Sequence, residues 1–453
     1  MIYNTFILNK NYDLSHEDIL KIREKKFRKL LRHAYTHSKF YHNYYNDNGI
    51  KKSDLAYIPI ENLPPIDKSI FIENFDDIVT DKNLSKHNIE EFIKNDDVSN
   101  KKFLGKYTII HSSGSTGTPT IFVYDKKAWE YVLAAAFRAC KGEIRIRDVI
   151  SEIGVKKFLI EGFRNLNVLY IAATEGRFAG VMAASSGISG FGFNPMLLNI
   201  NIPLDEWYDK VVSFMPRVII GYPSAIKILC DMIRENGLSF DIFRVVSCGE
   251  PLTKELRDYF ESVFNTDIFD LYGSSESLII GLGRKKYDGF YIFDDINYVE
   301  ANGNCIYLTS LYNFTQPLIR YKLTDIALAK ERNANEYLPF TKINGISGRN
   351  EDMMWFINDK GKKDFLHPLI IDDINIDGII KYQFIQHSYK DFEVDIEISN
   401  GADFDTVSNK FSDNIRKILN KKSLTGIRYT IKRVDRIPID SHSGKCKLVV
   451  RDF

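Results

Sequence analysis

The sequence predicts an α/β protein that ends in a small α+β domain. The chain has 453 residues, enough for two or three domains. Between about residues 165 and 310, strand-like apolar runs alternate with helical runs, as in sheets whose parallel strands are joined by crossover helices. Beyond about residue 350, short strands surround one long helix. We therefore expect a mixed α/β domain over residues 1–347 and an α+β domain over 348–453.

The first part of the chain predicts helices before the first strand. Residues 13–49 carry apolar side chains at helical spacing, and Ser15 stands where an N-cap residue is expected. Prolines in residues 61–79 mark a turn before a short helix. Residues 106–114 indicate a strand that runs into a loop, and residues 125–142 indicate the helix that follows.

The middle of the chain supplies the α/β alternation, and its end supplies the smaller domain. The expected parallel strands are 167–173, 217–223, 243–250 and 266–273, and the expected helices between them are 224–236 and 253–264. Residues 289–311 contain an Asn-Gly pair between two strand-like runs, which is typical of antiparallel strands. The last elements expected are strands at 381–387, 392–399 and 426–438, with a helix at 405–422.

The composition excludes several classes of protein. Lys and Arg number 61 and Asp and Glu number 60, so the formal charge of +1 disfavours nucleic-acid binding through a general positive field. The five cysteines form no CxxC pair, which argues against a zinc site or a disulfide framework and fits a reducing cytosol. No apolar run approaches the ~20 residues of a membrane span, and the N-terminus lacks the apolar core of a signal peptide. We expect a cytoplasmic protein.

The stretch HSSGSTGTPT, residues 111–120, is unusually rich in Ser, Thr and Gly. Such a composition is common in surface loops, and it also suits a phosphate-binding loop, because Gly lets the backbone approach an anion and hydroxyls add donors. It is not a standard P-loop, because no Lys follows its second Gly. The chain also lacks HExxH, GxSxG and a dinucleotide-binding GxGxxG within a βαβ unit. His111, just before the loop, is expected to be structural rather than an acid–base group.

Further short motifs follow the loop in a fixed order, and they decide its interpretation. They are GYPSAI (221–226), SCGEPL (247–252), DLYGSSES (270–277), PLIRYKLTDIA (317–327), ISGRNED (346–352) and SGKCK (443–447). Together with SSGSTGTP they resemble the motifs of adenylate-forming enzymes. Within that superfamily the chain is most similar to the phenylacetate–CoA ligase family, including the CapK-type proteins associated with capsular polysaccharide loci. RKLLRHAYTHSKFY (28–41) and ENLPPIDKSIF (61–71) resemble the N-terminal region of that family, so the resemblance spans nearly the whole chain.

This resemblance implies an ATP-dependent ligase with a small, mobile C-terminal domain. A carboxylate would attack the α-phosphorus of Mg·ATP to give an acyl-adenylate and pyrophosphate, and a thiol, by default coenzyme A, would then take the acyl group. Rotation of the small domain would separate the two steps. Two alternatives stay open: transfer of the acyl group or AMP to an amine, protein, sugar or coenzyme, and a non-catalytic nucleotide-binding homologue. The expected ligands are ATP, Mg²⁺, coenzyme A and a small carboxylic acid; the oligomeric state, including a homodimer, stays open.

The resemblance also assigns ATP contacts to individual residues. Tyr272 would pack on adenine, and Glu276 would hold Mg²⁺ and take part in catalysis; a polar turn with a solvated carboxylate is the alternative. The residues implied to bind the phosphates, or the adenine at the turn after residue 248, are Ser112, Ser113, Gly114, Ser115, Thr116, Gly117, Gly249, Glu250, Pro251, Gly273, Ser274 and Ser275.

The remaining assignments lie near the domain boundary and the C-terminus. Asp325 would accept hydrogen bonds from the ribose hydroxyls, although Thr324 stands where the family usually has Gly. Arg349 would reach the ribose or phosphate, with a structural ion pair as the alternative. Glu351 occupies the hinge position that usually carries Asp or Lys.

The catalytic lysine of the family corresponds to Lys445. It would stabilise the charge that develops between carboxylate and α-phosphate. Lys447 is its rival, and two solvated lysines are the alternative. The acid pocket is expected within residues 170–250, with 174–193 among its lining.

Overall fold

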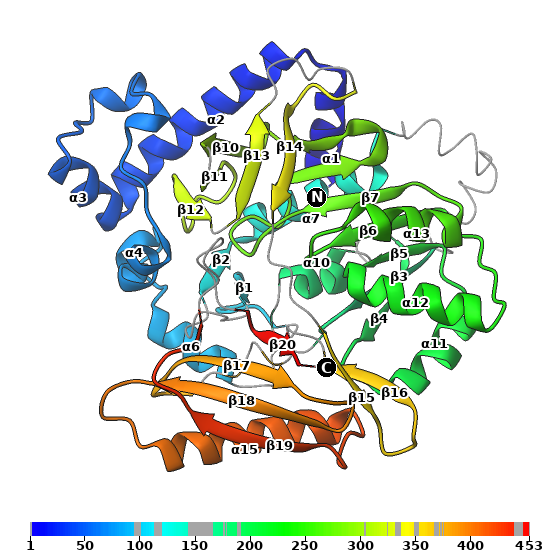
Figure 1. Ribbon diagram of the computed structural model, residues 1–453. Coiled ribbons are helices and arrows are strands. Elements are labelled where there is room, and N and C mark those ends of the chain that lie inside the picture. The colour runs from blue at the N-terminus through cyan, green and yellow to red at the C-terminus, as the bar shows by residue number, and fades with distance from the viewer. Residues whose placement is uncertain are drawn as a thin grey trace.

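The computed structural model confirms the α/β architecture and the separate α+β unit (Figure 1). It describes residues 2–94, 101–112, 120–143, 166–174, 177, 179–187, 192–302, 305–323, 325–330, 337–347, 353–366, 371, 374, 376–438 and 447–452. In Figure 1 the C-terminal strands and helix lie beneath the larger N-terminal part. Within these described segments, no helix has the length and apolar character that crossing a membrane requires.

A nine-stranded mixed sheet forms the centre of the N-terminal part, in the order β13-β14-β9-β8-β7-β6-β5-β3-β4. Its parallel strands are β3 (Asn167–Ala172), β4 (Asn194–Asn199), β5 (Val218–Gly221), β6 (Arg244–Cys248) and β7 (Ile268–Tyr272). Its antiparallel strands are β8 (Gly281–Arg284), β9 (Gly289–Ile292), β13 (Ile326–Lys330) and β14 (Thr341–Ser347). The alternation read from the sequence is confirmed for the parallel half. Strand β4 was not expected; it lies at the sheet edge, where its Pro195 is tolerated.

Helices cover this sheet and connect its strands. They are α7 (Lys126–Lys141), α10 (Ala179–Gly187), α11 (Trp207–Phe214), α12 (Pro223–Glu235) and α13 (Lys254–Phe264). Single 3-10 turns occur at Asn11–Asp13, Asp54–Ala56, Ile60–Asn62, Leu204–Glu206 and Lys285–Tyr287.

The N-terminal helices differ from the single long run that the sequence suggested. They are α1 (Ile2–Lys10), α2 (His16–His37), α3 (Lys39–Asp47), α4 (Lys68–Glu73), α5 (Phe75–Ile78) and α6 (Lys86–Lys94). The Ser15 side chain accepts a hydrogen bond from the Asp18 N–H at 3.1 Å, which confirms the predicted cap. Ser38 divides the run: its backbone is extended, its hydroxyl accepts from the Tyr41 N–H at 3.3 Å, and the same hydroxyl donates to the Asp77 carbonyl at 2.8 Å.

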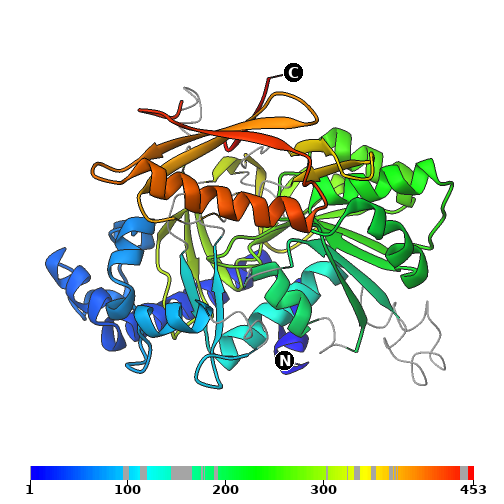
Figure 2. The ribbon, with the colours of Figure 1, turned by 90° about the horizontal axis from the view of Figure 1, so that it is seen from below.

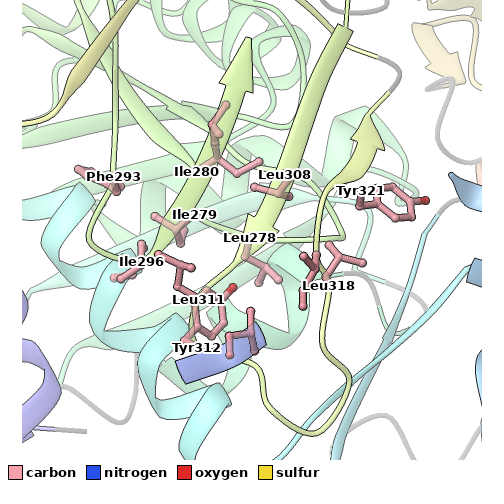
Figure 3. Packing of buried hydrophobic residues seen from close by; sticks show 14 of the residues in the cluster. Leu278, Ile279, Ile280, Phe293, Ile296, Leu308, Leu311, Tyr312, Leu318 and Tyr321 are labelled. Carbon is pink, nitrogen blue, oxygen red and sulfur yellow. The ribbon is translucent and has the colours of Figure 1, made fainter. Parts of the chain in front are cut away.

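Two smaller sheets complete the N-terminal part. One is the hairpin of β1 (Thr108–His111) and β2 (Ile121–Tyr124). The other contains β10 (Asn297–Asn302), β11 (Cys305–Ser310) and β12 (Tyr321–Leu323), all antiparallel, which confirms the strands expected around the Asn-Gly pair. Figure 3 shows side chains of the core that joins this sheet to the central one, including Leu278, Ile280 and Leu308.

The C-terminal unit has the predicted composition. Strands β17 (Ile379–Gln386), β18 (Asp391–Ile398), β19 (Arg428–Arg433) and β20 (Val449–Arg451) form one sheet in the order β19-β18-β17-β20. Helix α15 (Phe404–Lys421) runs along this sheet (Figure 2) and buries Phe411 and Ile415 in its core. A hairpin of β15 (Met354–Ile357) and β16 (Lys363–Leu366) precedes the sheet.

The two parts meet at a buried ion pair. Lys422, directly after α15, lies 2.9 Å from the Asp364 carboxylate, and both side chains are about 1% exposed or less. The Lys422 ammonium also donates to the backbone carbonyls of Ile200 and Ile202, each at 2.8 Å. The Asp364 carboxylate accepts from the Leu204 N–H at 3.0 Å. Burial lowers the pKa of Lys422, and Asp364 opposes that change. The segment after β4 thus contacts both charges through its backbone.

Apolar contacts extend this interface on the same hairpin. Phe365 is fully buried against the N-terminal part and meets Trp207 edge to face at 6.1 Å. Met354, Phe356 and Leu366 instead enter the core of the C-terminal unit. The hairpin therefore packs against both parts at once.

We predict that Lys422→Met lowers the free energy of unfolding by about 3–5 kcal/mol, because it leaves the Asp364 carboxylate buried without its counter-charge. Urea denaturation measures this, with Lys417→Met, an exposed lysine of α15, as the matched control. Adding Asp364→Asn to Lys422→Met should recover part of the loss. Equal unfolding midpoints for Lys422→Met and Lys417→Met would contradict the prediction.

Candidate active site

The motif DLYGSSES forms a tight turn at the carboxyl end of β7. A Cβ atom on Gly273 would lie 1.8 Å from the Leu278 carbonyl oxygen, so only glycine fits there. The Ser274 N–H donates to the Ser277 carbonyl at 3.1 Å, and the Ile280 N–H donates to the Tyr272 carbonyl at 2.9 Å. The chain therefore reverses sharply between Tyr272 and Ile280, and Glu276 lies within this turn.

A buried polar network anchors the turn. The Ser277 hydroxyl donates to Asn297 Oδ1 at 2.8 Å and lies 3.0 Å from the Tyr312 hydroxyl. The Asn297 amide donates to the Ile279 carbonyl at 2.8 Å. Figure 3 shows Tyr312 in the same packed group as Leu278 and Leu311. Because Ser277 and Asn297 are fully buried, these hydrogen bonds fix the turn against the core.

The structure brings two of the predicted nucleotide-binding residues into direct contact. The Tyr272 hydroxyl donates to Asp325 Oδ2 at 3.0 Å. Burial raises the pKa of Tyr272, and the Asp325 carboxylate raises it further, so the phenol keeps its proton and serves as donor. Tyr272 ends β7 and Asp325 precedes β13, so elements far apart in sequence meet here.

Glu276 lies close enough to Asp325 to feel its charge, and its side chain is half-buried. Burial raises the pKa of its carboxyl group; the Ser274 side chain lowers it by hydrogen bonding, while the Asp325 carboxylate raises it and the Lys68 ammonium lowers it. Burial raises the pKa of Tyr321, and the Glu276 carboxylate raises it further.

The oxygen donors around Glu276 fit Mg²⁺. Mg²⁺ is commonly held by one or two carboxylates together with waters and substrate phosphates. Glu276 can supply one such carboxylate. No cluster of three or more His, Cys, Asp or Glu suited to a metal occurs in the described part of the chain. A bound Mg²⁺ would therefore share its ligands with ATP.

The β1–β2 hairpin lies beside this turn. Ser112 closes the hairpin, because its N–H donates to the Thr120 carbonyl at 2.9 Å and its hydroxyl accepts from the Thr120 N–H at 2.9 Å. The Tyr124 hydroxyl, on β2, lies 3.4 Å from the Ser275 carbonyl and 3.5 Å from that of Glu276. Strand β2, which follows the hydroxyl-rich stretch in sequence, is thus adjacent to the DLYGSSES turn.

His111 has a structural environment, as expected. Its Nε2 accepts from the Arg177 backbone N–H at 3.2 Å, and its Nδ1 lies 3.1 Å from the Ser112 carbonyl. Burial lowers the pKa of His111, and the neutral ring with its proton on Nδ1 satisfies both contacts.

The SCGEPL motif forms the turn between β6 and α13. Gly249 has φ +81°, and a Cβ there would lie 2.7 Å from the Tyr222 ring. The Glu250 carboxylate accepts from the Ser224 N–H at 3.1 Å and from its hydroxyl at 2.9 Å, at the start of α12. The side chain of Glu250 thus supports a helix N-terminus. An adenine contact from Gly249, Glu250 or Pro251 stays a prediction.

Several predicted residues lie outside the described residues. These are Ser113, Gly114, Ser115, Thr116, Gly117, Arg349, Glu351 and Lys445, with part of the stretch 174–193. Lys447 is described: it is exposed, and its carbonyl accepts from the Gln383 amide at 2.8 Å.

Two residues near the site were missed in the sequence. Tyr321 lies in PLIRYKLTDIA, four residues before Asp325, and Lys68 lies in ENLPPIDKSIF. Both stretches were singled out, but the sequence gave no reason to pair either residue with Glu276.

Comparison with known proteins agrees with the motifs. The CapK C-terminal domain family matches residues 365–452. CapK of Staphylococcus aureus is 24% identical over 462 residues, covering 96% of this chain and 90% of that protein. Phenylacetate-coenzyme A ligase of Pseudomonas putida is 25% identical over 264 residues, about half of each chain (54%). Indoleacetate–lysine synthetase of Pseudomonas savastanoi is 31% identical over 145 residues, 31% of this chain and 36% of that protein.

The solved structures show the same fold. A 2-hydroxyisobutyryl-CoA ligase crystallised with 2-HIB-AMP and CoA has a TM-score of 0.60 at 18% identity, covering 98% of this chain and 91% of that chain. Its open form has a TM-score of 0.55 at 18% identity, covering 95% and 91%. On motifs, relatives and fold together, the chain fits the adenylate-forming superfamily of AMP-forming ligases, as a CapK-type protein similar to phenylacetate–coenzyme A ligase.

Proposed function

We propose that this protein joins a carboxylic acid to ATP, releases pyrophosphate, and transfers the resulting acyl group to the thiol of coenzyme A. The observation that carries the proposal is the contact of Tyr272 with Asp325 beside Glu276. Mg·ATP requires three kinds of group: an aromatic ring for adenine, an acceptor-only carboxylate for the ribose hydroxyls, and a metal-binding carboxylate for the Mg²⁺ on the phosphates. The similarity to phenylacetate-coenzyme A ligase supports it.

Each group has a role in the first step. One oxygen of the acid attacks the α-phosphorus of ATP, and the bond to the β-phosphate oxygen breaks, so pyrophosphate leaves with that electron pair. Asp325 would hold the ribose hydroxyls, and Tyr272 would lie on adenine while its hydroxyl orients Asp325. Mg²⁺ held by Glu276 would supply charge neutralisation on the phosphates. The Ser112–Gly117 loop would bind the phosphates through backbone N–H groups and hydroxyls.

The second step and the domain boundary are part of the same proposal. The thiol attacks the acyl carbonyl and AMP leaves. Lys445 would act in the first step only, from a C-terminal domain that begins at residue 348 and turns about Glu351. A cytoplasmic location is proposed with it.

An amine is the second candidate acceptor. The similarity to indoleacetate–lysine synthetase favours it, because the name of that relative states an acid joined to an amino acid. The adenylation step is the same for both acceptors, so the two candidates differ only after pyrophosphate has left.

ATP–pyrophosphate exchange across a panel of aryl, fatty, hydroxy and amino acids tests the proposal. We expect Mg²⁺-dependent exchange with at least one acid, because adenylation is reversible. With that acid, coenzyme A should be consumed in step with AMP release. AMP release at a constant thiol titre would replace coenzyme A by another acceptor, and the absence of exchange with every acid would contradict acid activation.

We predict that Asp325→Ala weakens ATP binding by about 2–3 kcal/mol, because hydrogen bonds to a charged acceptor are lost. Isothermal titration calorimetry measures this. Tyr272→Phe is the matched variant: it keeps the ring that would cover adenine and removes only the hydroxyl that orients Asp325. Its loss should be smaller. Unchanged ATP affinity in folded Asp325→Ala would remove the ribose assignment.

Lys445→Ala should slow pyrophosphate exchange by roughly a hundred- to thousandfold, because one preorganised donor at the developing charge is lost. ATP binding and acyl transfer from supplied acyl-adenylate should be nearly unchanged. Lys447→Ala is the control, and the exposed side chain of Lys447 leads us to expect a mild effect. A larger defect in Lys447→Ala would assign the catalytic role to Lys447.

A further inference from the structure

Two arginines pack against the ring of Phe269 in the central sheet. Arg244 is the first residue of β6 and Arg284 is the last residue of β8, and these two strands flank β7. The guanidinium carbon of Arg244 lies 3.8 Å from the centre of the Phe269 ring, and that of Arg284 lies 4.5 Å from it. Contact with the ring therefore holds both guanidinium groups in place.

Arg284 has carboxylate partners. Its Nε donates to the Asp267 carboxylate at 2.6 Å, and a terminal nitrogen donates to Glu143 at 3.2 Å. Glu143 also forms an ion pair with Lys286 and accepts a hydrogen bond from the Tyr287 hydroxyl. Both carboxylates near Phe269 are thus engaged by groups other than Arg244.

Arg244 has no counter-charge of its own, although it is only 7% exposed. Its Nε is enclosed without a hydrogen-bond acceptor, and the described part of the chain offers its guanidinium no hydrogen-bond or ion-pair partner. The two terminal nitrogens are not enclosed in this way, so a solute can reach them. Burial and the Arg284 charge lower the pKa of Arg244 to about 10, so the group is a cation at neutral pH. A buried cation without a partner carries a desolvation cost that an anion would offset.

Charge balance indicates the kind of anion. The group around Phe269 contains three cations and two carboxylates, which are Arg244, Arg284 and Lys286 with Asp267 and Glu143. One negative charge is therefore missing. A carboxylate supplies a single charge, and its two oxygens match the planar fork of a guanidinium. A phosphate group with two charges would exceed the balance.

We propose that Arg244 binds the carboxylate group of a small molecule at the amino-terminal edge of the parallel strands. The carboxylate accepts hydrogen bonds from the terminal nitrogens of Arg244, and no covalent step is involved. The turns after Cys248 and Tyr272 lie at the opposite ends of β6 and β7, so this binding site is separate from the proposed nucleotide site and independent of it.

Thermal unfolding with acetate as the probe tests the binding site. Sodium acetate is compared with sodium chloride and sodium phosphate at equal ionic strength and neutral pH. We expect about 100 mM acetate to raise the unfolding midpoint of the wild-type chain by about 1–3 °C more than chloride does, because a ligand of the folded state stabilises it. Arg244→Met should lose this rise. Arg244→Lys should keep only part of it, because the charge remains and the fork is lost.

The control variant is Arg234→Met. Arg234 is an exposed arginine of α12 that also lies over an aromatic ring, at 5.2 Å from the centre of Tyr259. Its replacement should leave the acetate response as it is in the wild-type chain. Arg244→Gln serves if Arg244→Met unfolds.

Three results would overturn the proposal. An equal acetate response in wild type and Arg244→Met would place the acetate elsewhere. The absence of an acetate response in wild type would leave Arg244 without a ligand of this class. A larger response to phosphate than to acetate, lost in Arg244→Met, would replace the carboxylate by a phosphate group.

Discussion

The candidate site depends on one steric constraint, the contact of Gly273 with the Leu278 carbonyl. At 1.8 Å from the position of a Cβ, that oxygen leaves no room for any side chain, so the turn after β7 closes only with glycine. Ser277 and Asn297 then fix the turn in the core with buried hydrogen bonds. Tyr272 and Glu276 owe their positions to this closure. A side chain at Gly273 would act on the site by opening the turn.

The site collects its groups from three distant parts of the chain, which are the turn after β7, the neighbouring strands β12 and β13, and α4. The turn supplies Tyr272 and Glu276, the start of β13 supplies Asp325, β12 supplies Tyr321 and α4 supplies Lys68. Burial raises the pKa of Glu276, and the nearby Asp325 carboxylate raises it further. A bound Mg²⁺, as proposed above, would lower the cost of ionising Glu276.

Local patterns predicted the helices and strands well, because helix caps, strand alternation and turns depend on residues that are close in sequence. Ser15 and the Asn-Gly pair at residue 302 are examples. The break between α2 and α3 at Ser38 was not predicted, because a serine is tolerated within a helix. The hydrogen bond from its hydroxyl to the Asp77 carbonyl is visible only in the structure. Edge strand β4 contains a proline and lacks alternation, so no local signal identified it.

The same distinction between local motifs and long-range contacts applies to the residues of the candidate site. Tyr272, Glu276 and Asp325 were found through motifs, and the Tyr272–Asp325 contact is the geometry that joins two of them. Tyr321 and Lys68 required the pairing of Ile66 with Tyr321, which joins residues from opposite ends of the N-terminal part. The spacing of residues along the sequence cannot reveal a contact between two residues that are so far apart in the chain. The loop, hinge and lysine motifs at 113–117, 349–351 and 445 remain predictions.

The ion pair of Lys422 and Asp364 bears on how the two parts of the chain can separate. Both charges follow residue 351 in sequence, whereas Ile200, Ile202 and Leu204, which contact them, precede it. A C-terminal domain that turned about residue 351 would carry the ammonium and the carboxylate away together. Among the groups that contact this ion pair, only neutral backbone groups would lose their partners, and water could replace these. The interface can thus be held by charge in its closed form and still open without stranding either ion.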